Sequence, residues 1–231
     1  MRKIGLVGGI SWTSTLDYYR YINEGVNQVL GGLESAECIV YSLNFAELQQ
    51  KGWENSFDLL LQACENLKTC GVEGIVLCAN TAHMFASGLQ EKTGVPIIHI
   101  ITATAMEIQM RNLQRVGLLG TKFTMQMPFY QEVLEQYGIE VLVPGNDKAV
   151  EEIHEIVKDE LGKGTILGTS KEKLMAYVHD LIQRGAQGII LGCTEIPLTL
   201  GQGDFGSIPV FDTTKIHVEH IVDFMINPSL Q

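Results

Sequence analysis

Two short polar segments carry residue types that suit proton-transfer chemistry. One reads Leu77-Cys-Ala-Asn-Thr-Ala-His83 and the other reads Leu191-Gly-Cys-Thr-Glu-Ile-Pro197, and each directly follows an apolar run. A cysteine at such a point lies near the N–H groups of the following helix, which are expected to lower its pKa and favour the thiolate. Glu195 could orient the Cys193 thiol or share its proton, although a capping carboxylate at a helix start is the alternative reading. Cys193 is therefore the first candidate for an acid/base residue.

The elements that must position these segments alternate along the chain. Nearly continuous apolar strands separated by helical patterns predict an α/β fold with parallel sheets covered on both faces. The expected strands are Lys3–Val7, Cys38–Leu43, Gly74–Leu77, Pro96–Ile100, Arg115–Leu119, Glu140–Val143, Gly188–Leu191 and Pro209–Phe211. Three helices are expected to begin at the caps Ser14, Ser56 and Ser170. Gly71 and Gly185 are expected to end the second and third of them.

An internal repeat organises this alternation. Gly5-Leu-Val-Gly8 recurs as Gly117-Leu-Leu-Gly120, Gly71-Val-Glu-Gly74-Ile-Val-Leu77 as Gly185-Ala-Gln-Gly188-Ile-Ile-Leu191, and Pro96-Ile-Ile98 as Pro209-Val-Phe211. A nearly constant offset predicts two similar lobes of four strands each, related by pseudo-two-fold symmetry. We expect residues 1–103, joined by a C-terminal helix over 213–231, to form the first lobe, and residues 104–212 the second. Because open parallel sheets bind ligands at the carboxyl ends of their strands, the site is expected in a cleft between the lobes.

Composition and charge exclude several classes of function. The chain of 231 residues has a net charge of −11, with 16 Lys and Arg against 27 Asp and Glu, and no basic cluster. Binding to nucleic acid or to an anionic membrane surface is therefore not expected. The longest apolar runs are too short to span a membrane, and the first residues indicate a buried strand, not a signal peptide. Five dispersed cysteines indicate reduced thiols in the cytoplasm, with Cys38, Cys64 and Cys70 read as structural.

Four motifs together resemble one family. Gly8-Gly-Ile-Ser11, Asn80-Thr-Ala-His83, Gly117-Leu-Leu-Gly-Thr121 and Gly192-Cys-Thr-Glu195 are similar to motifs of the aspartate/glutamate racemase superfamily, in its aspartate racemase branch. The likeness covers nearly the whole chain. It implies a racemase that needs neither pyridoxal phosphate nor any other cofactor, no metal, an aspartate- or glutamate-like amino acid as substrate, and a homodimer. In that family two cysteines, one from each half, act as general acid and base on opposite sides of the α-carbon.

The chain departs from the family pattern at the first cysteine. Ala79 occupies that position, and the repeat independently aligns Ala79 with Cys193 and Cys78 with Gly192. Because successive side chains on a strand point to opposite faces, Cys78 is expected to point away from the site, unless the strand ends early and the loop turns it inward. Racemisation is then expected to be weak or one-sided. Two alternatives stay open. One is a one-thiol decarboxylase or lyase-like enzyme, as arylmalonate decarboxylase of the same fold is, and the other is a non-catalytic amino-acid-binding protein.

The resemblance also implies residues that bind the substrate. It assigns the substrate carboxylate and amine to Ser11, Asn80, Thr81, Thr121 and Thr194. Gln50 is a candidate to bind the side-chain carboxylate of the substrate. The cation of Lys163 is a second candidate, and the alternative for Lys163 is a solvated loop lysine. A nicotinamide site is not expected, because the glycines after the first strand do not follow the Gly-x-Gly-x-x-Gly pattern. The spacing of Cys78, His83 and His99 matches no common zinc ligand set.

Overall fold

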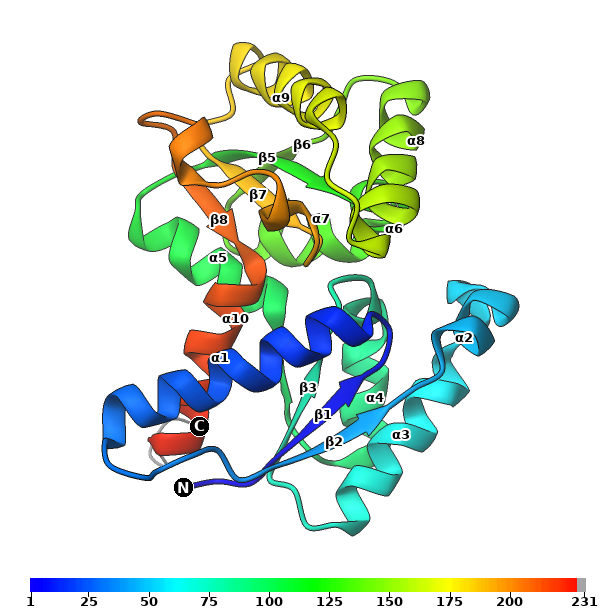
Figure 1. Ribbon diagram of the computed structural model, residues 1–231, viewed down its shortest axis with the longest axis vertical. Coiled ribbons are helices and arrows are strands. Elements are labelled where there is room, and N and C mark those ends of the chain that lie inside the picture. The colour runs from blue at the N-terminus through cyan, green and yellow to red at the C-terminus, as the bar shows by residue number, and fades with distance from the viewer. Residues whose placement is uncertain (228–231) are drawn as a thin grey trace. The chain divides into compact units, whose positions relative to one another are not determined.

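Each half of the chain builds its own parallel sheet in the computed structural model, which describes residues 1–227 (Figure 1). The first sheet has the order β2-β1-β3-β4, with β1 Ile4–Gly8, β2 Cys38–Ser42, β3 Gly74–Leu77 and β4 Ile97–Ile98. The second has the order β6-β5-β7-β8, with β5 Arg115–Gly120, β6 Glu140–Leu142, β7 Ile189–Gly192 and β8 Val210–Asp212. All eight predicted strands are present, shifted at most by a few residues at their ends, and the predicted α/β fold with two four-stranded parallel sheets is confirmed.

Helices connect the strands in both halves. The first half holds α1 Trp12–Leu30, α2 Phe45–Lys51, α3 Phe57–Thr69 and α4 Ala86–Thr93, with short 3₁₀ helices η1 Trp53–Asn55 and η2 Thr81–Phe85. The second holds α5 Ile100–Met110, α6 Lys122–Gln126, α7 Pro128–Gln136, α8 Asp147–Glu155 and α9 Gly168–Gln183, with the short helices η3 Ile156–Glu160, η4 Leu161–Lys163, η5 Ile196–Leu198 and η6 Gln202–Asp204. The helix expected over 213–231 is observed as α10 Thr213–Ile226, and residues 228–231 lie outside the described part of the chain.

The chain forms two compact units. One comprises Met1–His99 together with the chain from His217 onward, and the other comprises Ile100–Ile216. Two segments of chain therefore connect the units, one after His99 and one before His217.

Alternation along the strands gives each sheet two apolar faces. In the first unit, Ile4, Leu6 and Val76 pack against α1 and α10, while Gly5 lies on the opposite face, where a side chain would meet Leu67 of α3. In the second unit, Leu118 of β5 packs with α5 and α7, whereas its neighbour Leu119 packs with α8 and α9. Burial on both faces explains why the strands read as nearly continuous apolar runs.

Two of the three predicted helix caps are wrong. Ser11, not Ser14, caps α1, and its hydroxyl accepts a hydrogen bond from the Ser14 N–H at 3.4 Å. The helix begins earlier because Gly9, at φ +78°, turns the chain directly after β1. Helix α9 begins at Gly168 after the cap position Leu167, and the Ser170 hydroxyl inside its first turn donates to the Glu160 carboxylate.

The other expected helix ends are found. Ser56 precedes α3 as predicted, although its hydroxyl donates to the Gly52 carbonyl at 2.7 Å instead of capping the helix. Gly71 and Gly185 follow the last residues of α3 and α9 with positive φ, as expected for residues that end a helix.

The close approach of Gly9 to Leu43 in the turn after β1 can be tested by substitution. A Cβ at Gly9 would lie 2.1 Å from the Leu43 carbonyl oxygen, whereas a Cβ at Gly94, also in the left-handed region, would meet nothing within 4 Å. Gly94→Ala is expected to lower the free energy of unfolding by about 1 kcal/mol, the cost of left-handed backbone. Gly9→Ala is expected to cost more than about 3 kcal/mol, because backbone must also move. Equal losses for both variants in urea denaturation would contradict the close approach at Gly9.

Candidate active site

Strand register brings the predicted site segments together within each unit. In the first unit β1 and β3 pair in parallel, with Val7 opposite Leu77, so the segments that follow them leave the same edge of the sheet. Ser11 is thereby placed at the edge that also holds Ala79, Asn80 and Thr81.

In the second unit β5 and β7 pair with Gly120 opposite Gly192. Thr121 therefore begins at the same edge as Cys193, Thr194 and Glu195. A side chain at Gly120 would lie 3.0 Å from the Gly192 carbonyl oxygen, so glycine permits this close approach. Thr121 caps α6, and its hydroxyl accepts a hydrogen bond from the Thr124 N–H at 3.3 Å.

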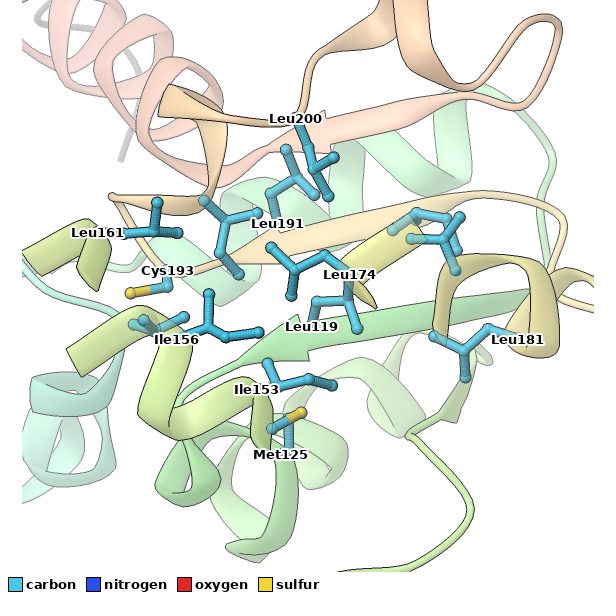
Figure 2. Close-up of a cluster of buried hydrophobic side chains, with 14 of the residues drawn as sticks. Leu119, Met125, Ile153, Ile156, Leu161, Leu174, Leu181, Leu191, Cys193 and Leu200 are labelled. Atoms are coloured by element: carbon cyan, nitrogen blue, oxygen red, sulfur yellow. The ribbon is translucent and has the colours of Figure 1, made fainter. Parts of the chain in front are cut away.

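Cys193 lies at the end of the apolar cluster of the second unit. Figure 2 shows it beyond Leu191, on the side of Ile156 and Leu161, and its exposed fraction is 8%. The Cys193 thiol donates to Oε2 of Glu195 at 2.9 Å, and the Thr194 hydroxyl donates to the same oxygen at 2.7 Å. Glu195 is itself buried. A thiol and a carboxylate thus share one enclosed hydrogen-bonded arrangement.

The pKa of Cys193 is raised well above its ordinary value, so the predicted lowering of this pKa is wrong. Burial is the largest cause, and the negative charge of Glu195 and the hydrogen bond from the thiol to its carboxylate act in the same direction. Backbone N–H groups of Thr194 and Glu195 oppose these effects but do not overcome them. At neutral pH Cys193 is a thiol, which can give a proton.

The corresponding position of the first unit holds no thiol. Cys78 continues the face of Val76 and is fully buried among the residues that pack against α1 and α10. Burial raises the pKa of the Cys78 thiol, as expected for a structural cysteine. Ala79, which the repeat aligns with Cys193, is half-buried, and Asn80 beside it is buried.

The remaining predicted binding residues differ in their surroundings. Ser11 is half-buried, its hydroxyl 2.8 Å from that of Thr13, and Thr81 is buried at the start of η2. Gln50 is exposed on α2. Lys163 is exposed at the end of η4 and pairs with Asp159 at 3.1 Å, which favours the solvated reading of this lysine. Gln50 lies on the helix that follows β2, which pairs in parallel with β1 with Ser42 opposite Gly8, so α2 leaves the same sheet edge as the Ser11 segment. Lys163 follows no strand directly, and register does not bring it to a strand-edge segment.

Within residues 1–227, no group of three or more His, Cys, Asp or Glu side chains is arranged to hold a metal ion. Among the helices of this described part, none is both long enough and apolar enough to cross a membrane.

The fold and the site define an α/β protein with two similar parallel-sheet units. A Cys-Thr-Glu segment follows the central strand of the second unit. The sequence model of the Asp/Glu/Hydantoin racemase family matches residues 7–221, and the chain belongs to this family.

Solved structures agree with this assignment. A protein from Yersinia pestis assigned to the Asp/Glu racemases superposes with a TM-score of 0.90 at 43% identity, covering 98% of this chain and 100% of that one. An aspartate racemase homologue from Pyrococcus horikoshii has a TM-score of 0.83 at 39% identity, covering 97% of this chain and 99% of that one.

A curated relative is more distant. The broad-specificity amino-acid racemase of Bacillus subtilis is 28% identical over 67% of this chain, and the match spans 66% of that protein. The match to a glutamate racemase of Aquifex aeolicus spans 63% of that protein's length.

The effect of Glu195 on the Cys193 thiol can be measured by alkylation. In Glu195→Gln the carboxylate charge is gone, so the pKa of Cys193 falls and its thiolate fraction rises at a given pH. Iodoacetamide modification of Cys193, followed by peptide mass spectrometry at pH 8, is expected to accelerate on the order of tenfold, the change that one pKa unit produces. The exposed Cys70 serves as the internal control and should react equally in both proteins. An unchanged or slower rate at Cys193 would refute the electrostatic role of Glu195.

Proposed function

We propose that this protein is an isomerase of aspartate- or glutamate-like amino acids that transfers the α-proton through Cys193 without pyridoxal phosphate or another cofactor. The observation that carries the proposal is the buried Cys193 thiol held by the Glu195 carboxylate. We also propose that the protein is a cytoplasmic homodimer. Its proposed lobes comprise residues 1–103 with 213–231, and residues 104–212.

The protonation step follows from the state of the thiol. For inversion, a water molecule on the face that Cys193 does not serve takes the α-proton as the Cα–H bond breaks, and the electron pair of that bond stays on carbon. The Cys193 S–H then delivers its proton to the other face of that carbon. The products are a new Cα–H bond and a Cys193 thiolate. The reverse step returns the α-proton to that thiolate. The anionic Glu195 disfavours the thiolate, so the pair is better suited to giving a proton than to taking one.

The substrate carboxylate and amine are proposed to bind Ser11, Asn80, Thr81, Thr121 and Thr194. Hydroxyl and amide groups at strand ends, with the first turns of helices behind them, are suited to a carboxylate. Negative charge grows on this carboxylate as the α-carbon loses its proton, so donors placed there stabilise the transition state. Gln50 and Lys163 are retained as proposed contacts of the substrate side chain, although the ion pair of Lys163 with Asp159 would first have to open.

A one-sided proton transfer is the second candidate function. Ala79 has no proton to give or take, and Cys78 is buried in the core against α1 and α10. An enzyme with this arrangement protonates a carbanion from one face, as in a decarboxylase or lyase-like reaction. A protein that binds amino acids without turnover is the remaining alternative.

Incubation of L- and D-aspartate and of L- and D-glutamate with the protein in D₂O separates these functions. Isomerisation is expected to give the opposite enantiomer with deuterium at Cα, detected by chiral chromatography and proton NMR. Exchange of one enantiomer with retention would indicate one-sided transfer, and no exchange with thermal stabilisation by the amino acid would indicate a binding protein.

Two variants test the assigned residues in the same assay. Ala79→Cys supplies the second acid/base group and is expected to increase racemisation by about 10²-fold or more, the contribution typical of a placed proton-transfer group. Cys193→Ser is expected to abolish exchange, while Cys70→Ala, which removes an exposed thiol, leaves it unchanged. If Cys193→Ser keeps full exchange, or if Cys78→Ala alone removes it, the assignment of the thiol is wrong.

A further inference from the structure

His83, His99 and His217 form a cluster in the first unit that takes no part in the proposed proton transfer. The His83 ring meets the His99 ring edge-on at 4.9 Å between centroids and the His217 ring at 5.5 Å. Tyr18 of α1 packs edge-on against His217 at 5.6 Å. His83 and His217 are buried, and His99 is half-buried. Sequence spacing gave no sign that His217 joins the other two.

Hydrogen bonds define the protonation of two of these rings. Nε2 of His217 donates to the Ile98 carbonyl at 2.7 Å, because a carbonyl oxygen can only accept. In a neutral ring Nδ1 then accepts, and the Tyr18 hydroxyl donates to it at 2.8 Å. By the same reasoning Nδ1 of His83 donates to the Ala79 carbonyl at 3.0 Å, while Nε2 of His83 is buried with no hydrogen-bond partner.

The cluster connects the Ala79 segment to both crossings of the chain between units. His99 is the last residue before the chain leaves the first unit, and His217 is the first residue after it returns. His83 packs on both and binds the Ala79 carbonyl, directly before Asn80 and Thr81. The backbone at Ala79 is therefore held by the His83 side chain, which in turn packs against His99 and His217.

We propose that His83 is a positioning residue, which holds the Ala79 carbonyl and thereby directs the Asn80 and Thr81 groups that bind the amino acid. This inference rests on the proposed function for the role of Asn80 and Thr81. The Nδ1 proton of His83 is engaged by the Ala79 carbonyl, so the residue acts through that carbonyl and the segment after it.

Burial keeps the cluster neutral at pH 7, because it lowers the pKa of each of the three histidines. Burial, with His99 and His217 adding to it, lowers the pKa of His83 well below its ordinary value. Burial lowers the pKa of His99 to about 4 and that of His217 to about 3, with His220 a smaller influence on His217. The titratable groups that face His83 are His99 and His217, and Tyr18 reaches the cluster through His217.

The sign of the pH effect follows from these directions. Above about pH 6.5 the histidines are neutral in both the folded and the unfolded chain, so they make no contribution that depends on pH. As the pH falls below that value, the unfolded chain takes up protons that the folded cluster excludes. The folded arrangement therefore loses stability progressively down to about pH 4 and 3, where His99 and His217 are protonated.

Two substitutions separate positioning from simple packing. In His83→Asn the side-chain amide can donate to the Ala79 carbonyl in place of Nδ1–H, whereas His83→Leu fills space without a donor. Hydrogen exchange of the amides of residues 79–83, measured by mass spectrometry at pH 7, is expected to accelerate about tenfold in His83→Leu, as the loss of a buried hydrogen bond implies. His83→Asn is expected to restore most of the protection, and His179→Leu, at an exposed histidine, to leave it unchanged.

A pH series adds a readout that packing alone does not produce. Protection of residues 79–83, corrected for intrinsic exchange, is expected to fall between pH 6.5 and 4 in the unmodified protein and to fall less in His83→Asn. Where aspartate binds, its affinity should weaken at least about tenfold in His83→Leu and recover in His83→Asn. Equal protection in His83→Leu and the unmodified protein, or equal loss in both variants, would overturn the inference. Amide hydrogen exchange needs no turnover. Its result is therefore independent of the deuterium incorporation at Cα that tests the proposed function.

Discussion

Parallel pairing of the two central strands in each sheet is the constraint on which the rest of the structure depends. Val7 opposite Leu77 and Gly120 opposite Gly192 bring segments that are about 70 residues apart in sequence to one sheet edge. Backbone approaches backbone closely at two strand ends where glycine permits it: Gly9 lies against Leu43, which follows β2, and Gly120 at the end of β5 lies against Gly192 of β7. Because the strands are buried on both faces, the first side chains free to do chemistry are those just beyond the strand ends.

Competition between backbone donors and a buried carboxylate decides the state of Cys193. Hydrogen bonds to a charged group contribute about 1.5–3 kcal/mol each. Two unit charges about 4 Å apart repel by about 4 kcal/mol at the effective dielectric of a protein surface. Burial acts on the same side as this repulsion and is the largest of the three effects, so the thiol form wins. The backbone N–H groups at this strand end are therefore not sufficient to favour the Cys193 thiolate against burial and the Glu195 charge.

Apolar periodicity and the internal repeat were sufficient to predict the two sheets. Each buried strand is a run of consecutive apolar residues, which the sequence shows directly. The helix caps were harder: Ser14 and Ser170 have the right residue type, but Gly9 and the η4–α9 connection determine where the helices begin. The state of Cys193 could not be predicted, since burial and the direction of the Glu195 side chain are tertiary facts. The meeting of His83 with His217 is tertiary for the same reason.

The two units have diverged in chemistry while they kept a common plan. Cys193 extends the face of Leu191, and the repeat places Ala79 at the equivalent point after Leu77. In the second unit this point carries a proton next to a carboxylate, whereas in the first it carries a methyl group whose backbone is bound by a neutral histidine. At this point the first unit therefore holds hydrogen-bonding groups without a titratable side chain, and the second holds a thiol proton. If Cys193 is the proton donor, as proposed, the methyl group of Ala79 has no proton to supply, so an isomerase with these residues needs water as its second proton donor or acceptor.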